Sequence, residues 1–450
     1  MKVYIKTYGC QMNERDSEAA AGMLAARGYE LVDREEIADV LIFNTCSVRD
    51  QAERKAMGKL GILKRLKKLR PEIVIGVMGC MAQNRGEEIL QTIPHVDFAI
   101  GTGQLHKLPD ILADVLARHD RELRLDDDPD VLTGMGEHYD LAHQVSAYIA
   151  ITRGCNRFCS YCIVPYVRGR EVSREIADIR AEAQRLVDAG IREIMLLGQN
   201  VAAYGWGGNV NPPPDDVSPF ADLLTELNSI PGLKRLRFTS PYPSYFNRKL
   251  IAAIATLPTV CHHVHLPLQS GSDRILKLMN RQYTSAQYRT IVDRLRAALP
   301  DLTFSTDVIV GFPGETDADF QATRDLMNQV GFDNAFIFKY SPRQETPAAG
   351  MPLQLAQEVK EKRNQLLLDD LALRVAESNR RLVGQSVEIL VEGVSKRNPD
   401  RWTGRTSANK VVIFTPDDRT AVGDLVNIKI ERCTAMSLYG TMERAPEQKS

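Results

Sequence analysis

The chain has 450 residues, 44% of them hydrophobic and 26% charged, which is enough for about three domain cores and excludes wholesale disorder. Its 57 basic and 58 acidic side chains give a net charge of -1, which excludes a globally basic nucleic-acid binder but allows a locally basic patch. No apolar run is long enough to span a membrane, and the start is charged and carries a cysteine where a signal peptide needs an apolar run, so we expect a cytoplasmic protein.

Residues 1–118 alternate predicted strands with predicted helices. The strands are predicted at residues 2–7, 39–44, 73–78 and 96–100, and helices at 17–27 and 54–70. This alternation predicts a parallel, doubly wound sheet. Cys10, Cys46 and Cys80 each follow a predicted strand, so we expect three thiols that are distant in sequence to meet at the carboxyl edge of this sheet.

Residues 119–140 include the acidic run 126–130 and are predicted to be a linker. Residues 141–373 then repeat a strand and a helix six times. The strands are predicted at 145–152, 193–197, 235–239, 261–266, 302–310 and 334–339. Six units are too few for a closed eightfold barrel, so we expect an open, partial (β/α)6 barrel with ligands at the carboxyl ends of its strands.

Residues 376–441 change to short alternating runs punctuated by glycines. This pattern predicts a small antiparallel β-barrel similar to an oligonucleotide-binding fold. Basic residues crowd around one aromatic ring within residues 396–410 of this segment. We predict RNA contact through Arg401, Trp402, Arg405 and Lys410, because positive charge suits phosphates and an aromatic ring suits base stacking.

Three further cysteines, Cys155, Cys159 and Cys162, form a Cys-x3-Cys-x2-Cys motif after the first barrel strand. A structural zinc site is one explanation, but zinc usually takes four ligands, and no fourth thiol is paired with these three. Three thiolates can instead hold three irons of a [4Fe–4S] cluster and leave the fourth iron open for a small molecule. By the same count, the three thiols of the N-terminal sheet predict a second cluster, and two clusters suggest two tasks.

This motif, at the end of a strand in a partial barrel, resembles the signature of the radical S-adenosylmethionine (SAM) superfamily. With the N-terminal three-cysteine domain and a C-terminal segment that resembles a TRAM domain, an RNA-binding module, nearly the whole chain resembles the methylthiotransferase family. Several segments are similar to the tRNA branch of that family: NTCSVR (44–49), CIVPYVRGRE (162–171), LPLQSGS (266–272), GFPGET (311–316) and YSPR (340–343).

The resemblance implies a reaction. An electron from the barrel cluster cleaves SAM to methionine and a 5′-deoxyadenosyl radical, and the second cluster holds or supplies sulfur. It implies methylthiolation of C2 of N6-isopentenyladenosine beside the anticodon, at adenosine-37. Two alternatives keep this chemistry and change the target, to threonylcarbamoyl-adenosine in tRNA or to a ribosomal-protein aspartate. A third alternative is a non-enzymatic RNA-binding module with structural metal.

Position at the strand ends, together with the resemblance, assigns SAM contacts to Gly198, Gln199, Gln269 and Gly311. Beyond the cluster ligands, no catalytic residue is predicted. The expected cofactors are two [4Fe–4S] clusters and SAM. The expected partners are a tRNA anticodon stem-loop that carries isopentenyladenosine and an electron-donor protein. A monomer without membrane attachment is expected, and the sulfur source stays open.

Overall fold

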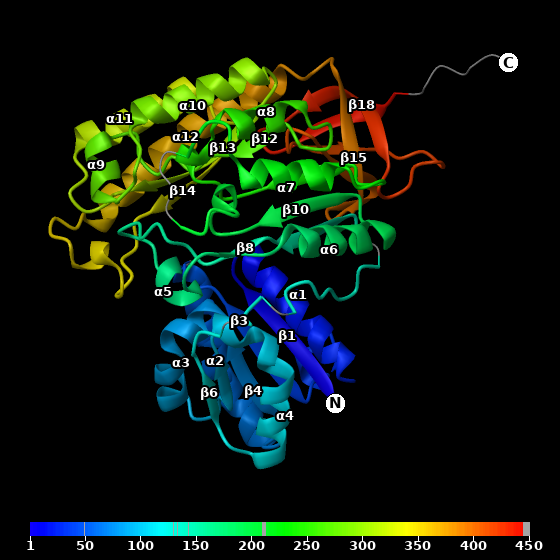
Figure 1. The fold of residues 1–450 in the computed structure, drawn as a ribbon, viewed down its shortest axis with the longest axis vertical. Helices are drawn as coiled ribbons and strands as arrows, with labels where there is room; N and C mark the ends of the chain where they lie inside the picture. The colour runs from blue at the N-terminus through cyan, green and yellow to red at the C-terminus, as the bar shows by residue number, and fades with distance from the viewer. Residues whose placement is uncertain (49, 129, 133, 143, 209–212, 444–450) are drawn as a thin grey trace.

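The computed structural model describes the chain except for residues 49, 129, 133, 143, 209–212 and 444–450. It shows an N-terminal sheet domain, a central half-barrel above it and a small C-terminal barrel beside the half-barrel (Figure 1). In the described part of the chain, no helix combines the length and the apolar character needed to cross a membrane.

A six-stranded parallel sheet with the order β2-β1-β3-β4-β5-β6 forms the N-terminal domain. Its strands are β1 (Lys2–Tyr8), β2 (Glu30–Leu31), β3 (Val40–Thr45), β4 (Val74–Met78), β5 (Phe98–Ile100) and β6 (Glu122–Arg124). One face is covered by α1 (Gln11–Ala26) and α4 (Leu108–Arg118), and the other by α2 (Asp50–Leu69) and α3 (Cys80–Thr92). Alternate strand residues bury their side chains in two separate cores, which confirms the doubly wound prediction.

Two strands of this sheet, the start of α1 and the presence of α3 differ from the sequence predictions. β6 lies within the residues predicted to be a linker, where Leu123 pairs with Ala99 of β5. β2 was likewise unpredicted, because strands of two or three residues leave no readable period. α1 begins at Gln11 instead of residue 17, and α3, which was not predicted, begins at Cys80, so each of these helices starts directly at a cysteine loop.

The central domain is an open half-barrel of parallel strands. Its order is β7-β10-β11 followed by β12-β13-β14, and Leu236 and Val260 bridge the two sheets. The strands are β7 (Ser146–Ala150), β10 (Glu193–Leu197), β11 (Arg235–Phe238), β12 (His263–His265), β13 (Thr303–Val310) and β14 (Asn334–Lys339). Among the described strands, β7 and β14 are the two edges, so the barrel is open between them and the partial-barrel prediction is confirmed.

Six longer helices cover the outside of the half-barrel and bury one side of each strand. They are α6 (Ile176–Asp188), α7 (Pro219–Asn228), α8 (Arg248–Thr256), α10 (Ser285–Ala298), α11 (Asp317–Val330) and α12 (Gln357–Arg380). Two shorter helices, α5 (Val164–Arg168) and α9 (Asp273–Leu278), and the paired strands β8 (Thr152–Arg153) and β9 (Val172–Ser173) lie around the cysteine loop. The other side of each barrel strand faces the lumen.

The C-terminal domain is a closed barrel with the order β15-β16-β17-β19-β18. Its strands are β15 (Ser386–Ser395), β16 (Asn398–Thr406), β17 (Val411–Phe414), β18 (Leu425–Cys433) and β19 (Leu438–Met442). The predicted antiparallel barrel is confirmed, except that β17 pairs with β19 in parallel. The turn between β16 and β17 docks at the amino ends of the half-barrel strands, where Arg237 donates hydrogen bonds to the carbonyl oxygens of Thr406 (2.8 Å) and Ser407 (2.9 Å).

Candidate active site

Three thiols meet at the carboxyl edge of the N-terminal sheet. Cys10 follows β1, Cys46 follows β3, and Cys80 follows β4 and begins α3. A hydrogen bond with Cys46 lowers the pKa of Cys10 to about 6 against the opposing effect of burial, and the Arg168 charge assists. Burial raises the pKa of Cys80, whose charge also interacts with that of Cys10. The structure therefore brings together the three thiols that the topology predicted to meet, which we call the N-terminal triad.

A buried asparagine pair holds the loops of the N-terminal triad. Asn13 donates to Oδ1 of Asn44 at 3.0 Å, and Asn44 donates to the carbonyl oxygen of Asn13 at 2.8 Å. The Cys10 thiol donates to Oδ1 of Asn13 at 3.2 Å. Gly79, just before Cys80, has a φ of +89°, and a Cβ there would lie 2.2 Å from Oδ1 of Asn44. Only glycine therefore fits this turn beside the thiols.

Buried cations surround the N-terminal triad. Arg168, at the end of α5, donates to Oδ2 of Asp16 at 2.6 Å and is hydrogen-bonded to Cys80. Burial would lower the pKa of Arg168, but Asp16 and the nearby thiols hold it well above its usual value. Burial, with help from the Arg168 charge, lowers the pKa of Arg153 to about 10. Positive charge gathered around thiols in a dry site fits an anionic group held by those thiols.

Cys155, Cys159 and Cys162, which we call the barrel triad, lie on the loop between β8 and α5. Burial raises the pKa of Cys155 to about 11 and raises that of Cys162 as well, and the neighbouring Cys159 charge contributes to both shifts. The loop turns at Gly154, which has a φ of +80° and where a Cβ would lie 2.0 Å from the carbonyl oxygen of Arg170. The three thiols are therefore close enough to influence one another.

The number and kind of ligand atoms in each triad decide whether it suits a single metal ion or a metal cluster. In the part of the chain that the structure describes, no three Cys, His, Asp or Glu side chains converge on a point where they could hold one metal ion. A lone zinc ion usually takes four ligands, whereas each triad offers three thiols. A [4Fe–4S] cluster binds each thiolate to a different iron, so it suits thiols that are neighbours without sharing one centre. Thiol-only ligands and adjacent arginines fit such a cluster at both triads.

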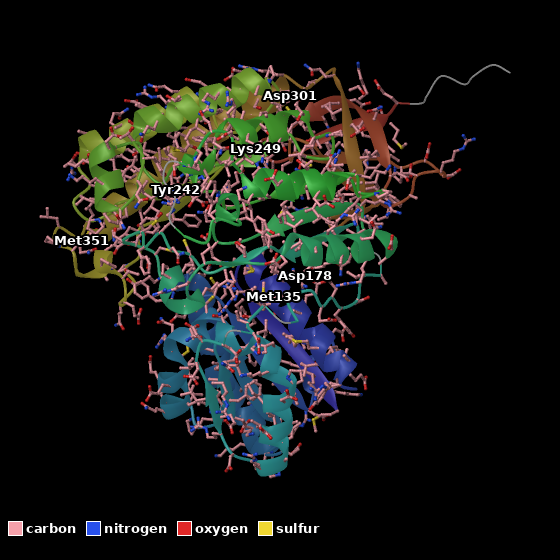
Figure 2. All side chains as sticks on the ribbon, in the orientation of Figure 1. Met135, Asp178, Tyr242, Lys249, Asp301 and Met351 are labelled. Carbon is pink, nitrogen blue, oxygen red and sulfur yellow. The ribbon has the colours of Figure 1, made fainter. Side chains whose placement is uncertain are left out.

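Two guanidinium groups and two tyrosine rings stack beside the barrel triad. Arg281 lies 4.3 Å from the centroid of the Tyr242 ring and 5.0 Å from that of Tyr283, and its Nη1 donates to Sγ of Cys159 at 3.5 Å. Arg157 lies 4.4 Å from the centroid of the same Tyr242 ring. Figure 2 shows Tyr242 within the half-barrel part of the molecule. Arg281 could not be predicted from the sequence, because its contact with Cys159 spans 122 residues.

The residues predicted to contact SAM all lie at the carboxyl ends of barrel strands. Gly198 and Gln199 follow β10, and Oε1 of Gln199 accepts a hydrogen bond of 2.5 Å from the backbone N–H of Gly154, next to the barrel triad. Gln269 forms a bridge to Val308 of β13, and Gly311 follows the same strand. The structure thus places Gln199 beside the barrel triad, whereas Gln269 and Gly311 lie on the neighbouring sheet.

Glu171 is a further polar residue beside the barrel triad, and it was not predicted from the sequence. Burial raises the pKa of its carboxyl group to about 7. Its Oε1 is buried and accepts no hydrogen bond from the described residues. The signal was present in the sequence, since Glu171 ends the CIVPYVRGRE segment, but nothing in that segment showed which side chain would be buried.

The four residues predicted to bind RNA differ in whether other residues of the protein already contact their side chains. Arg401 is exposed on β16, and Trp402 is partly buried against the core of the small barrel. Arg405 forms an ion pair of 2.9 Å with Glu392. Lys410 lies 3.1 Å from Oδ1 of Asp333 in the half-barrel. The charges of Arg405 and Lys410 are therefore already paired within the protein, whereas Arg401 faces solvent.

Sequence models of three families match the three domains. The Uncharacterized protein family UPF0004 matches residues 2–101, the Radical SAM superfamily residues 149–327, and the TRAM domain residues 380–442. Among solved structures, the radical S-adenosylmethionine methyltransferase TsrM from Kitasatospora setae has a TM-score of 0.58 at 14% identity and covers 77% of each chain. At such low identity, this likeness supports the fold and carries no conclusion about function.

Curated relatives are similar over the full length. A protein from Opitutus terrae is 46% identical over 98% of this chain and 97% of its own, and one from Moorella thermoacetica is 47% identical over 97% of each. A third, from Akkermansia muciniphila, is 45% identical over 98% of each chain. All three carry the name tRNA-2-methylthio-N(6)-dimethylallyladenosine synthase.

Proposed function

The chain belongs to the family of tRNA-2-methylthio-N(6)-dimethylallyladenosine synthases, and we propose from this that it adds a methylthio group to C2 of dimethylallyladenosine beside the anticodon of tRNA. Dimethylallyl and isopentenyl name the same five-carbon group. The observation that carries the proposal is the presence of two separate thiol triads at one junction, because one cluster can serve radical formation and the other sulfur transfer. The names of the relatives do not favour threonylcarbamoyl-adenosine or a ribosomal-protein aspartate as the target.

Each triad would hold one [4Fe–4S] cluster, and SAM would bind at the barrel triad. When bound, these groups supply radical chemistry and sulfur that the side chains of this protein cannot supply. The protein positions them: Arg168 and Asp16 fix the N-terminal triad, and Arg281 contacts Cys159. The buried carboxyl group of Glu171 joins the residues proposed to bind SAM, which are Gly198, Gln199, Gln269 and Gly311.

The proposal includes the partners. Arg401 and Trp402 would contact the tRNA, whereas the paired Arg405 and Lys410 would hold the small barrel in place. The barrel cluster needs an electron donor, which we expect to be a protein. A cytoplasmic monomer is the form in which we expect the enzyme to meet tRNA, since thiols of this kind need a reducing compartment.

The experiment is an assay of purified, anaerobically reconstituted protein with tRNA that carries dimethylallyladenosine. The parent should form the methylthio nucleoside, detected by mass spectrometry. Cys46→Ala should lose this product and keep reductive SAM cleavage, because Cys46 lies outside the barrel triad. Replacing all three barrel cysteines by alanine should remove about half the iron and all SAM cleavage. Formation of 5′-deoxyadenosine by that triple variant would disprove the assignment of the triads.

A further inference from the structure

Two phenylalanine rings lie exposed next to each other on the edge strand β14. Phe336 is 49% exposed and Phe338 is 42% exposed, although both belong to a strand of the half-barrel. Their ring centroids are 6.5 Å apart and their planes differ by 14°, so the rings are nearly parallel. A pair of large exposed rings in a domain with a full apolar core points to a ligand, because burying them would be favourable.

Alternation along β14 shows which way these rings face. Ala335 is buried in the core beneath the outer helices and Ile337 packs against it, so Phe336 and Phe338 point to the opposite side, into the lumen. In the pairing of β13 with β14, Phe336 lies opposite Asp307 and Phe338 lies opposite Ile309. Because β14 is an edge among the described strands, the rings lie where the half-barrel is open.

The sheet that carries the rings is linked by contacts to the loops of both triads. Ile309, the partner of Phe338, packs in a cluster that includes Tyr161, which stands between two cysteines of the barrel triad. Past the end of β14, Arg343 donates a hydrogen bond of 2.8 Å to the carbonyl oxygen of Val48, two residues after Cys46 of the N-terminal triad. The rings therefore belong to a strand pair whose neighbouring residues contact the loops of both triads.

Polar groups adjoin the rings on the same face of the sheet. Ser305 is hydrogen-bonded to His263 and to His265, each at 2.9 Å, and His265 lies 3.2 Å from Oδ2 of Asp307. The His265 ring meets Phe336 edge-on, with centroids 6.1 Å apart. Flat apolar surface beside hydrogen-bonding groups suits a molecule that is part heteroaromatic ring and part hydrocarbon.

We propose that Phe336 and Phe338 are the specificity-determining residues that bind the N6-dimethylallyl group and stack on the adenine ring that carries it. This inference rests on the proposed function, which makes such a base the substrate. The dimethylallyl group is apolar and needs an apolar surface to cover it, whereas an unmodified adenosine would leave part of the two rings in water. The pair therefore makes the protein prefer tRNA that already carries the hydrocarbon group.

The test measures binding, so it does not depend on turnover. Fluorescence anisotropy with the reconstituted full chain would compare two anticodon stem-loop RNAs, one with dimethylallyladenosine and one with adenosine at the same position. The parent should bind the alkylated RNA more tightly than the unmodified RNA. In the double variant Phe336→Ala, Phe338→Ala, the ratio of the two affinities should fall by about tenfold or more. Phe338→Tyr should keep most of it, because the ring remains. The matched control is Leu373→Ala, which removes a side chain that is 74% exposed on α12.

Each other outcome overturns the inference. An unchanged preference in the double variant means that the rings do not bind the alkylated base. Equal weakening for both RNAs means that they contact RNA without reading the modification. If the rings instead mediate association of two copies of the chain, sedimentation would show a parent dimer that the double variant loses, with RNA preference intact. Failure of the proposed function would look different, because the parent would then form no methylthio product.

Discussion

Arg281 is the residue at which the stack of rings and guanidinium groups meets the barrel triad. Two tyrosine rings hold its guanidinium in place, so its charge has little freedom to move away from Cys159. A fixed positive charge beside a cluster ligand favours the more negative, reduced form of the cluster. We therefore regard Arg281 as a positioning residue that adjusts the reduction potential of the barrel cluster.

Replacing Arg281 by methionine should lower the midpoint potential of the barrel cluster, on the order of tens of millivolts. The reason is the loss of a buried positive charge near Cys159. The measurement is a redox titration followed by electron paramagnetic resonance on protein whose N-terminal triad is replaced by alanine. Arg281→Lys, which keeps the charge, should stay closer to the parent. Equal potentials in the methionine variant and the parent would contradict this role.

Among the elements, the turn between β16 and β17 connects the small barrel to the half-barrel. Arg237 of β11 supports this turn by donating two hydrogen bonds to its carbonyl oxygens. Arg237 also forms an ion pair of 2.7 Å with Glu193, and both of these side chains are buried. Lys410 adds a contact to Asp333, which follows α11. The small barrel is thus held against the amino ends of the strands, on the opposite side of the half-barrel from the triads.

Arg237→Ala should destabilise the protein by about 3–5 kcal/mol, because it leaves the Glu193 carboxylate buried without its partner. We expect the midpoint of urea unfolding to fall, and trypsin to cleave near residues 381–385 sooner than in the parent. Arg118→Ala serves as the control, since it breaks an exposed ion pair with Asp114 on α4, far in sequence from the monitored cleavage site, and should leave the midpoint unchanged. A parent-like midpoint for Arg237→Ala would show that the turn is held by other contacts.

The sequence predicted those elements and contacts that depend on the order of strands and helices along the chain. Strand ends that share an edge were enough to bring Cys10, Cys46 and Cys80 together, and the hydropathy pattern was enough for the half-barrel. It could not show that Arg168 would reach Asp16 across 152 residues, because such a contact depends on how two domains pack. For the same reason, Lys410 looked available to RNA in the sequence but is paired with Asp333 in the fold.

In the whole molecule, a buried charge cluster fixes the N-terminal domain to the half-barrel. His138 lies between Glu18 of α1, at 2.9 Å, and Glu182 of α6, at 2.7 Å. Arg15 of α1 and Arg174 also lie within ion-pair distance of Glu182. Met135 marks this junction in Figure 2 and accepts a hydrogen bond from Arg15. Burial lowers the pKa of His138, but the hydrogen bonds with the two carboxylates outweigh it and raise the pKa above the usual value.

This cluster should make stability depend on pH in the neutral to alkaline range. Because the folded pKa of His138 is raised, its contribution is complete below the unfolded pKa of about 6.5 and is lost as pH rises through the folded pKa. His138→Gln should therefore lower the melting temperature by a few degrees near pH 6 and by less near pH 9. A difference that stays constant over this pH series would contradict the assigned cause.

The short helix α5 connects the two triads, and this connection bears on which step limits the catalytic cycle. It begins two residues after Cys162 and ends at Arg168, which is hydrogen-bonded to Cys80, and at about 1.5 Å per residue it is a rigid spacer of roughly one and a half turns. The separation of the two triads therefore depends on this short helix and on the hydrogen bond between Arg168 and Cys80, which joins the two domains. With the two domains joined in this way, successive steps would need no movement of one domain relative to the other, so we expect the entry and departure of tRNA to set the pace of the catalytic cycle.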